Sequence, residues 1–502
     1  MKDSLKSQPA LLAAAAAAGG LTVAGFAPMS VFPLPVAALC AMLFLWQNAT
    51  PKAAFFRGFA FGAGLFGVGA SWVYVSLHDF GMMPAPLAAI GTVAYCAILS
   101  LYPAGAAWCL CRLRTRGAIR ALLAFPALWT LFEWWRGWMF TGVPWLALGY
   151  SQVDSPLAGI APLAGVYGVS FATALCAGLL YVAIIGAGRA RLASALAIVF
   201  ALGLGQALRQ VEWTSAQGSP VRVALLQGNI SQDLKFQAGR YAVTLALYKK
   251  LVESSDARLI VLPETAIPRF LDAVDPGYLN EISRNAAARG ADVLIGVPIR
   301  EPDGRYFNSV ISAGASRPQR YDKAHLVPFG EFVPWGFHWI VNTVAIPMSD
   351  FSLGTENPKP LSLAGQRVAP NICWEDAFGE EIIRQLPEAT LLVNVSNVAW
   401  FGDSLAPAQH LQISRMRAIE TGRTMLRATN TGMTAIIGPR GEVVARLPQF
   451  TEGVLAGEAQ GYTGASPYVR WGNVPVVVIS IALVAALAFQ RRRALGAHGE
   501  SR

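Results

Sequence analysis

Three short stretches of the sequence each place ionisable side chains directly after an apolar run typical of a buried strand. They are VLPETAIP with Glu264, YDKAHLVPFGEFVP with Lys323 and Glu331, and NICWED with Cys373 and Glu375. In an α/β fold, the ends of strands bring side chains from distant parts of the chain to one site. We therefore expect these five side chains to lie in a common cleft.

A cysteine, a carboxylate and a lysine supply the groups that thiol-mediated acyl transfer requires. A thiol is a weak nucleophile at its free pKa of about 8.5 and needs a base or a nearby cation. Glu264 could take the thiol proton, and the Lys323 ammonium could stabilise both a thiolate and the oxyanion of a tetrahedral intermediate. Each residue also has an ordinary reading: Cys373 as a buried small side chain, Glu264 as a helix N-terminal acid, and Lys323 as a solvated loop residue.

The other cysteines lie in or at the ends of apolar segments, where a small hydrophobic side chain packs without further purpose; they are Cys40, Cys96, Cys109, Cys111 and Cys176. Cys373 is the sole cysteine of the polar part of the sequence, so it has no partner there for a disulfide. The sequence has no HExxH or CxxC spacing, and we expect neither a metal nor another cofactor.

The elements that must position these residues belong to two different environments. Of 502 residues, 54% are apolar and 14% charged, against about 45–50% and 25% in soluble domains. The apolar excess lies at residues 9–209 and 474–489. We expect a membrane domain of about seven transmembrane helices at 1–212, a soluble catalytic domain at 218–462, a C-terminal transmembrane helix at 472–490 and a basic tail at 491–502.

Membrane spans are expected wherever the sequence offers about 20 mostly apolar residues, enough to cross a hydrocarbon core about 30 Å thick. Residues 1–27 also resemble a secretory signal, but the spans that follow favour an uncleaved first helix. The eight expected spans are 9–27, 31–46, 54–77, 83–111, 121–139, 158–187, 190–209 and 472–489.

The basic residues give the expected orientation. The loops at 47–57, 112–120 and 187–191 hold eight Lys and Arg, whereas the loops on the other side hold one, Arg136. By the positive-inside rule we expect both termini in the cytoplasm and the soluble domain on the far side of the membrane, which for the inner membrane of a bacterium is the periplasm. The net charge of +10 belongs mainly to the cytoplasmic segments, so it gives no support for a nucleic-acid partner.

Within the soluble part, short strand-like runs alternate with helix-like stretches at 239–255, 276–290 and 407–422, which predicts an α/β domain. The expected strands are 221–227, 259–264, 291–298, 308–314, 390–397 and 434–441.

The order of Glu, Lys and Cys, with the motifs around them, resembles the nitrilase (carbon–nitrogen hydrolase) superfamily. VPFGEFVP and WFGDS between flanking membrane helices resemble the apolipoprotein N-acyltransferase family. The resemblance implies an αββα catalytic domain joined to a transmembrane bundle. It also implies that Glu264 is the general base, Lys323 the oxyanion stabiliser and Cys373 the nucleophile.

Other positions match the family as supporting residues. Glu331 and Glu375 match its acidic positions, while Asn308 and the TNTG run at Asn430 match positioning residues. Two positions depart from the family: Phe236 stands where Trp is frequent, and Trp374 where Tyr is common. Both keep an aromatic face, but a role for an indole N–H at 236 or a phenol O–H at 374 is put in doubt.

Aromatic residues near the motifs suggest contact with lipid. The segment 333–348 contains Trp335, Phe337 and Trp339, and WFGDS contains Trp400 and Phe401. Aromatic rings favour the headgroup level of a membrane, so we expect these residues to face lipid. An ordinary buried segment is the alternative for 333–348.

The family resemblance implies an acyl donor that is a phospholipid, typically phosphatidylethanolamine, and an acceptor that is the N-terminal amine of a diacylglyceryl-cysteine on an apolipoprotein. A thioester at Cys373 would link the two half-reactions in ping-pong order, in a protein that we expect to be a monomer. One alternative is a membrane-tethered amidase that hydrolyses a C–N bond. The other is a transporter or sensor without catalysis, which would favour ionisable residues in the middle of spans.

Overall fold

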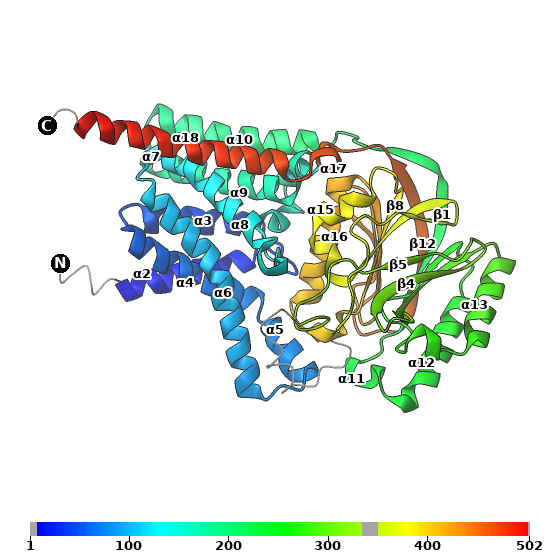
Figure 1. The fold of residues 1–502 in the computed structure, drawn as a ribbon. Helices are drawn as coiled ribbons and strands as arrows, with labels where there is room; N and C mark the ends of the chain where they lie inside the picture. Colours follow the sequence, from blue (N-terminus) through cyan, green and yellow to red (C-terminus); the bar gives the residue numbers. More distant parts are fainter. Residues whose placement is uncertain (1–7, 334–349, 500–502) are drawn as a thin grey trace. The chain divides into compact units, whose positions relative to one another are not determined.

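The computed structural model describes residues 8–333 and 350–499, and the chain divides into two compact units (Figure 1). We call Met1–Tyr74, Ala85–Val211 and Arg470–Arg502 the helical unit, and Val75–Pro84 with Glu212–Val469 the sandwich unit. Each unit has its own core.

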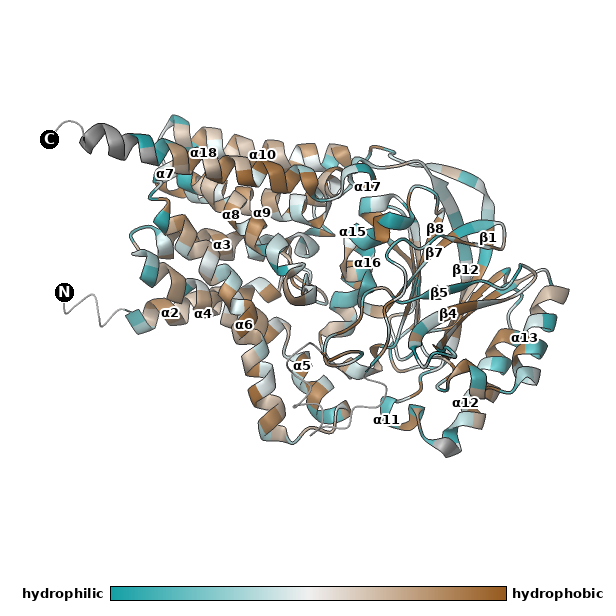
Figure 2. Cartoon of the chain, viewed as in Figure 1, coloured by the Kyte–Doolittle hydropathy of each residue, from teal (hydrophilic) through white to brown (hydrophobic). Residues whose placement is uncertain are grey.

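The helical unit consists of apolar α-helices, and brown, apolar residues predominate along them in Figure 2. A helix lies in each of the eight stretches that the sequence analysis expected to be apolar spans. Its main helices are α2 (Gln8–Val23), α3 (Pro33–Trp46), α4 (Pro51–Gly69), α6 (Ala85–Arg112), α8 (Phe125–Arg136), α9 (Ala161–Ile185), α10 (Arg189–Leu208) and α18 (Val474–Gly499).

Four helical stretches among the described residues are long and apolar enough to cross a membrane: Ala85–Arg112, Pro156–Ile185, Arg189–Leu208 and Val474–Arg491. A fifth results if Pro51–Gly69 is taken together with Trp72–Phe80. Helices α2 and α3 are apolar but only 16 and 14 residues long. The count of eight spans therefore stays a prediction.

Helix α8 begins later than the sequence pattern suggests because the turn before it is a π-helix. The helical segment from α7 (Gly117–Ile119) through the π-helix η2 (Arg120–Ala124) leads directly into α8. Pro126 stands near the start of α8 and has no N–H to bond back to Leu122. A missing backbone bond of this kind favours a local change of helical pitch. Glu133 and Arg136 lie in the last turn of α8, toward its end as the sequence suggested.

The sandwich unit contains two six-stranded sheets. Sheet one has the order β12-β1-β2-β3-β4-β5, with β1 (Ser215–Gln227), β2 (Leu259–Val261), β3 (Asp292–Arg300), β4 (Tyr306–Gly314), β5 (Arg320–Asp322) and β12 (Gly453–Thr463). Sheet two has the order β11-β10-β9-β8-β7-β6, with β6 (Leu361–Leu363), β7 (Gln366–Ile372), β8 (Leu391–Ser396), β9 (Thr424–Thr429), β10 (Ala435–Ile437) and β11 (Val443–Arg446).

Alternation along the strands separates two buried faces of each sheet. In β1, Val223 and Leu225 join a core that includes Val393 and Leu426 of sheet two, whereas the intervening Ala224 packs with the helices outside sheet one. Successive side chains of a strand point to opposite faces. Both faces of these strands are therefore covered, which accounts for their nearly continuous apolar sequences.

Helices cover the outer face of each sheet. Residues of α12 (Ala238–Glu253) and α13 (Pro276–Ala288) pack on sheet one, and residues of α16 (Ala406–Thr421) and α15 (Gly379–Ile382) pack on sheet two. The layers are helix, sheet, sheet and helix, which confirms the αββα expectation. Strands were found in all six runs predicted for this part, and helices in all three helix-like stretches.

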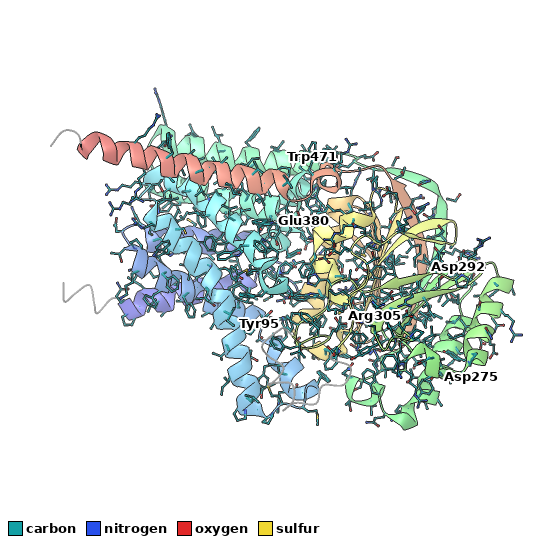
Figure 3. The ribbon with its side chains drawn as sticks, viewed as in Figure 1. Tyr95, Asp275, Asp292, Arg305, Glu380 and Trp471 are labelled. Atoms are coloured by element: carbon teal, nitrogen blue, oxygen red, sulfur yellow. The ribbon has the colours of Figure 1, made fainter. Side chains whose placement is uncertain are left out.

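A buried carboxylate fastens the two sheets together at the first residue of β3. Asp292, labelled in Figure 3, accepts hydrogen bonds from the N–H and the hydroxyl of Ser316, each at 2.7 Å. It also accepts one, at 2.7 Å, from the N–H of Ala364, which lies in the turn between β6 and β7. The carboxylate therefore links the end of β4 to the β6–β7 turn, beside the apolar core that the two sheets share.

Candidate active site

Cys373 stands at a sharp turn between a strand and a short helix. It follows β7 directly and begins the 3-10 helix η7 (Cys373–Ala377), with a left-handed φ of +55°. Residues other than glycine rarely adopt this backbone conformation, so the surrounding structure must hold it in place. Asn394 of β8 contributes to this by donating its amide to the Cys373 carbonyl at 2.9 Å. The residue as a whole is partly exposed at this turn.

Glu264 lies in the loop after β2, and both oxygens of its carboxylate are fixed. Oε1 accepts from the Asn308 amide of β4 at 2.8 Å, and Oε2 accepts from the main-chain N–H of Asn397 at 2.7 Å. Gly296 of β3 packs against the same loop so closely that a Cβ there would lie 2.3 Å from the Pro263 carbonyl oxygen. The loop is thereby held against the sheet beneath it.

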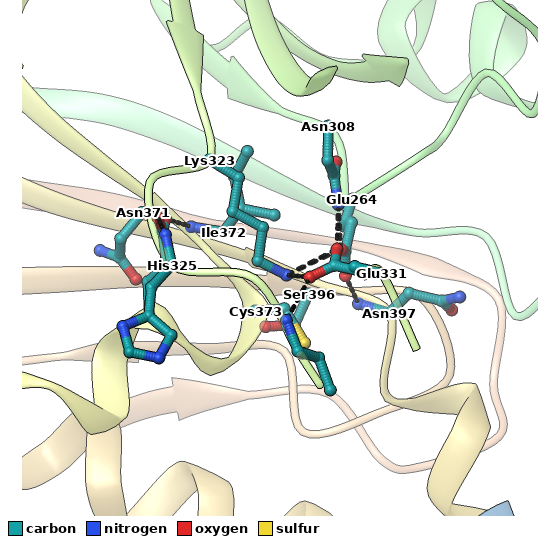
Figure 4. A network of polar contacts seen from close by, with 12 residues as sticks. Glu264, Asn308, Lys323, His325, Glu331, Asn371, Ile372, Cys373, Ser396 and Asn397 are labelled. Atoms are coloured by element: carbon teal, nitrogen blue, oxygen red, sulfur yellow. Dashed lines mark hydrogen bonds and ion pairs between the residues drawn. The ribbon is translucent and has the colours of Figure 1, made fainter. Parts of the chain in front are cut away.

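Lys323 follows β5 and is 1% exposed, with its ammonium between two carboxylates (Figure 4). Its Nζ lies 2.8 Å from a carboxylate oxygen of Glu331 and 3.7 Å from Oε1 of Glu264. The Asn308 amide, which contacts Glu264, also donates to Glu331 at 2.8 Å. Three ionisable side chains and one amide therefore form a single network beside Cys373.

Glu375 braces the two chain segments that carry Lys323 and Cys373. Its carboxylate accepts from the N–H of Ile372 at 2.6 Å, immediately before the cysteine. It also accepts from the N–H groups of Ala324 and His325, at 2.6 and 3.1 Å, immediately after the lysine, and from the Tyr321 hydroxyl at 2.8 Å. One buried carboxylate thus joins the segment before Cys373 to the segment after Lys323.

The electrostatic surroundings assign the resting protonation states. Desolvation and the negative charge of Glu264 raise the pKa of the Cys373 thiol well above its ordinary value, although Lys323 lowers it in part. Burial alone would lower the pKa of Lys323, but the carboxylates of Glu331 and Glu264 outweigh it and raise that pKa. The resting site therefore holds a neutral thiol and an ammonium, and the thiol needs a base when it reacts.

The remaining predicted residues lie farther out. Phe236 is 44% exposed. Trp374 is buried and meets Phe378 edge to face, with ring centroids 5.5 Å apart. Trp400 and Phe401 lie in η9 (Val398–Phe401), where both are partly buried. Trp335, Phe337 and Trp339 lie outside the residues that the structure describes.

Two contacts of the site were missed by sequence reasoning. Lys235 is almost fully buried and reaches the Glu264 main chain, and Asn397 holds the Glu264 carboxylate. Asn397 is the last residue of the predicted strand 390–397 and stands in the SNVAWFGDS run, and this position at a strand end was a signal for it. Lys235 had no such signal, because a lysine in a short polar stretch is ordinarily solvated.

In residues 8–333 and 350–499, no group of three or more His, Cys, Asp or Glu side chains is arranged to hold a metal ion. The arrangement instead offers a nucleophilic sulfur, a carboxylate that can accept its proton and an ammonium that can face a developing oxyanion. These are the parts of covalent catalysis at a carbonyl carbon.

Comparison with known proteins gives two family matches. Residues 18–179 match the family described as apolipoprotein N-acyltransferase N-terminal domain, and residues 222–468 match carbon-nitrogen hydrolase. The chain is 49% identical to an apolipoprotein N-acyltransferase of Nitrosomonas europaea, over 96% of this chain and 98% of that protein. It is 47% identical to the enzyme of that name from Chromobacterium violaceum, over 96% and 95% of the two chains.

Proposed function

The chain belongs to the apolipoprotein N-acyltransferase family and is a membrane acyltransferase, and from this premise we propose its substrates and the roles of its residues. The acyl donor is a phospholipid, with phosphatidylethanolamine as the favoured class. The acceptor is the N-terminal amine of a diacylglyceryl-cysteine on an apolipoprotein. The observation that carries the proposal is the meeting of Cys373, Glu264 and Lys323 at the ends of β7, β2 and β5.

In the first half-reaction, Glu264 takes the thiol proton as the sulfur of Cys373 attacks the ester carbonyl carbon of the donor. The carbonyl oxygen becomes an oxyanion, and the Lys323 ammonium stabilises its charge. When the intermediate collapses, the bond to the glyceryl oxygen breaks and that oxygen takes the proton from Glu264. The products are a thioester on Cys373 and a lysophospholipid.

In the second half-reaction, the acceptor amine attacks the thioester carbonyl carbon. Glu264 takes a proton from the attacking nitrogen, and Lys323 again faces the oxyanion. The carbon–sulfur bond breaks, an amide forms, and the sulfur of Cys373 recovers its proton from Glu264. A thioester suits this sequence because it keeps the acyl group reactive toward an amine.

An amidase would share the first steps and differ by admitting water to the thioester. Family membership favours transfer to an amine over hydrolysis. It likewise leaves the transporter or sensor without support, since the carbon-nitrogen hydrolase match covers residues 222–468.

The proposed acyl-enzyme has a direct test on the intact protein. The purified chain in detergent is incubated with a phosphatidylethanolamine of defined acyl chains, without acceptor, and its mass is measured. We expect a gain of one acyl group in the wild type, no gain in Cys373→Ala, and almost none in Glu264→Gln, which keeps the shape but cannot take the proton. Adding a diacylglyceryl-cysteine peptide should remove the acyl group and extend the peptide by the same mass. Normal transfer by Cys373→Ala would show that the mechanism is wrong.

We further propose that the sandwich unit lies in the periplasm and that both termini are cytoplasmic, since the basic loops favour this orientation. A reporter that is active only outside the cytoplasm, fused after Trp213, should be active. Activity of a cytoplasmic reporter at the same junction would contradict the orientation.

The aromatic residues of 333–348, together with Trp400 and Phe401, are proposed to contact the acyl donor. Replacing Trp335, Phe337 and Trp339 with Ser should reduce transfer from bilayer lipids more than transfer from short-chain soluble esters. Equal losses with both donors would indicate a role in packing.

A further inference from the structure

A second lysine reaches the centre of the site from a different element. Lys235 is the last residue of the short helix α11 (Gln232–Lys235) and is 2% exposed. Its Nζ donates to the main-chain carbonyl of Glu264 at 3.1 Å. The residue after Glu264, Thr265, has a left-handed φ of +48°. The ammonium therefore holds the main chain of the base at the point where that chain turns sharply.

The segment that carries Lys235 is fastened to the strand ends of sheet two. The Asn397 amide donates to the side chain of Gln232 at 2.7 Å. The Asn430 amide donates to the Ile230 carbonyl at 2.6 Å and accepts from the Ile230 N–H at 3.0 Å. Asn397, whose N–H holds the Glu264 carboxylate, thus also holds the segment whose lysine contacts the Glu264 carbonyl. Asn397 therefore positions both Glu264 and the segment of Lys235.

The charges around Glu264 explain why a lysine is placed there. Glu264 and Glu331 are two carboxylates that share the single ammonium of Lys323. Without another cation these groups would carry one uncompensated negative charge in a buried place, which costs free energy. Acylation moves a proton from the thiol to Glu264 and creates an oxyanion, so the total charge is unchanged. The same uncompensated negative charge would persist in the transition state and would oppose the formation of the oxyanion.

On these grounds we propose that Lys235 is a positioning residue for acyl transfer: a second cation that fixes Glu264 and balances the negative charge of the site in both half-reactions. The inference rests on the function proposed above. It assigns Lys235 no proton transfer and no contact with the substrate.

The two lysines differ in how firmly they hold their proton. Burial lowers the pKa of Lys235 to about 8, while the negative charges of Glu264 and Cys373 oppose this shift in part. Asp233, on the same helix, is exposed and accepts from the Ser231 hydroxyl. Glu331 pairs with Lys323, whose pKa is raised. Lys235 is therefore charged below about pH 8 and loses its charge above it, whereas Lys323 stays charged.

The test measures the acylation half-reaction alone, so that titration of the acceptor amine plays no part. Rates of thioester formation on Cys373 are followed by intact-protein mass spectrometry at pH 7 and pH 9. The variants are Lys235→Met, Lys235→Arg and, as a matched control, Lys250→Met on the exposed surface of α12. Thermal unfolding of each variant in the same detergent establishes that it is folded.

We expect the wild-type rate to fall about tenfold between pH 7 and pH 9, as a cation with a pKa of about 8 loses its charge. Lys235→Met should be about 10- to 100-fold slower at pH 7 and should lack this alkaline decline. Lys235→Arg keeps its charge at both pH values, so it should lack the decline while retaining more activity at pH 7 than the Met variant. Lys250→Met should match the wild type.

The outcomes separate this inference from the function on which it rests. A Lys235→Met protein with the wild-type rate and pH profile would overturn the inference. So would a Lys235→Arg protein that declines at pH 9 as the wild type does, and this second result decides the matter even if Lys235→Met fails to fold. Failure of wild-type Cys373 to become acylated would overturn the proposed mechanism itself and is recognised before any Lys235 variant is measured.

Discussion

The two sheets of the sandwich unit build their halves of the active site in different ways. On sheet one, the functional groups hold each other, because the Lys323 ammonium lies 2.8 Å from Glu331 and the Asn308 amide donates to both Glu331 and Glu264. On sheet two, side chains bind main-chain groups: the Asn394 amide donates to the Cys373 carbonyl, and the Glu375 carboxylate accepts from the Ile372 N–H. Cys373 has a φ of +55°, and Asn397 presents its N–H to Glu264.

The difference indicates what each half can tolerate. A network of paired charges loses its balance when a single member is neutralised, since its partners remain buried and unpaired. A turn held by backbone hydrogen bonds depends instead on the shape of the chain and on the acceptors around it. We therefore expect charge substitutions to affect mainly sheet one, and the loss of an acceptor or a change of shape to affect the turns.

Among the substitutions that test this comparison, the largest effect is expected from Lys323→Met on the sheet-one half. It leaves the buried carboxylates of Glu264 and Glu331 without their shared cation and removes the oxyanion stabiliser. Losing one such stabiliser costs about 10²–10³ in rate. Single-turnover measurements should show this loss in acylation and in transfer to an amine alike. Lys359→Met, at an exposed loop position, serves as the control. A loss confined to one half-reaction would contradict a common oxyanion role.

A smaller effect is expected from Glu375→Gln on the brace between the halves. The amide group of Gln would face N–H donors, and an unsatisfied buried donor costs about 1–3 kcal/mol. If that free energy is added to the activation barrier, because Lys323 and Cys373 are displaced, acylation slows by about 10- to 100-fold. Glu388→Gln, on the surface, is the matched control. Wild-type activity in Glu375→Gln would mean that the brace does not set the distance between Lys323 and Cys373.

The same carboxylate predicts an acid limit for the wild type. Burial raises the pKa of Glu375 to about 7, although Lys323 and the donors of Ile372 and Tyr321 oppose the shift. The carboxylate is ionised above this pKa and protonated below it, so the brace is lost as the pH falls from 8 to 6. Acylation rates across this range should fall in the wild type, and the part of the decline due to Glu375 should be absent from Glu375→Gln.

The smallest of these effects is expected from Gly296→Ala, which changes shape and leaves every charge in place. The added Cβ would lie 2.3 Å from the Pro263 carbonyl oxygen and 2.9 Å from the Glu264 Cα. Overpacking of this kind costs about 1–3 kcal/mol, and a displaced Glu264 should slow acylation by about tenfold. Gly239→Ala, where a Cβ meets nothing within 4 Å, is the control. An unchanged melting temperature and rate in Gly296→Ala would show that the Glu264 loop tolerates displacement.

The architecture could be predicted where a strand is buried on both faces, because its sequence is then almost continuously apolar. β3 and β8 are of this kind. For β7 the Cys373 motif implied a strand end but no strand range was predicted, since Gln366, Pro370 and Asn371 interrupt its apolar pattern. Hydrogen bonds to β8 on one side and to β6 on the other stabilise it as a strand although its own sequence is not continuously apolar.

The ionisable residues of the site could be proposed from long motifs, and the structure brings Glu264, Lys323 and Cys373 together with Glu331, Glu375 and Asn308. Their catalytic roles stay predictions. Lys235 could not be found in this way, because its significance depends on a contact with a carbonyl 29 residues along the chain. Nor could sequence spacing reveal that Asn397 meets a carboxylate 133 residues away.

The pairing of β1 with β12 has a consequence for the two ends of the segment between α10 and α18. Ser215 at the start of β1 is the register partner of Thr463 at the end of β12. The two ends of the insertion between α10 and α18 therefore lie side by side on neighbouring strands of sheet one. Closely spaced ends are the condition under which circular permutation and domain insertion succeed. A chain that joins these two ends by a short linker and opens at an exposed loop elsewhere would keep all twelve strands in place.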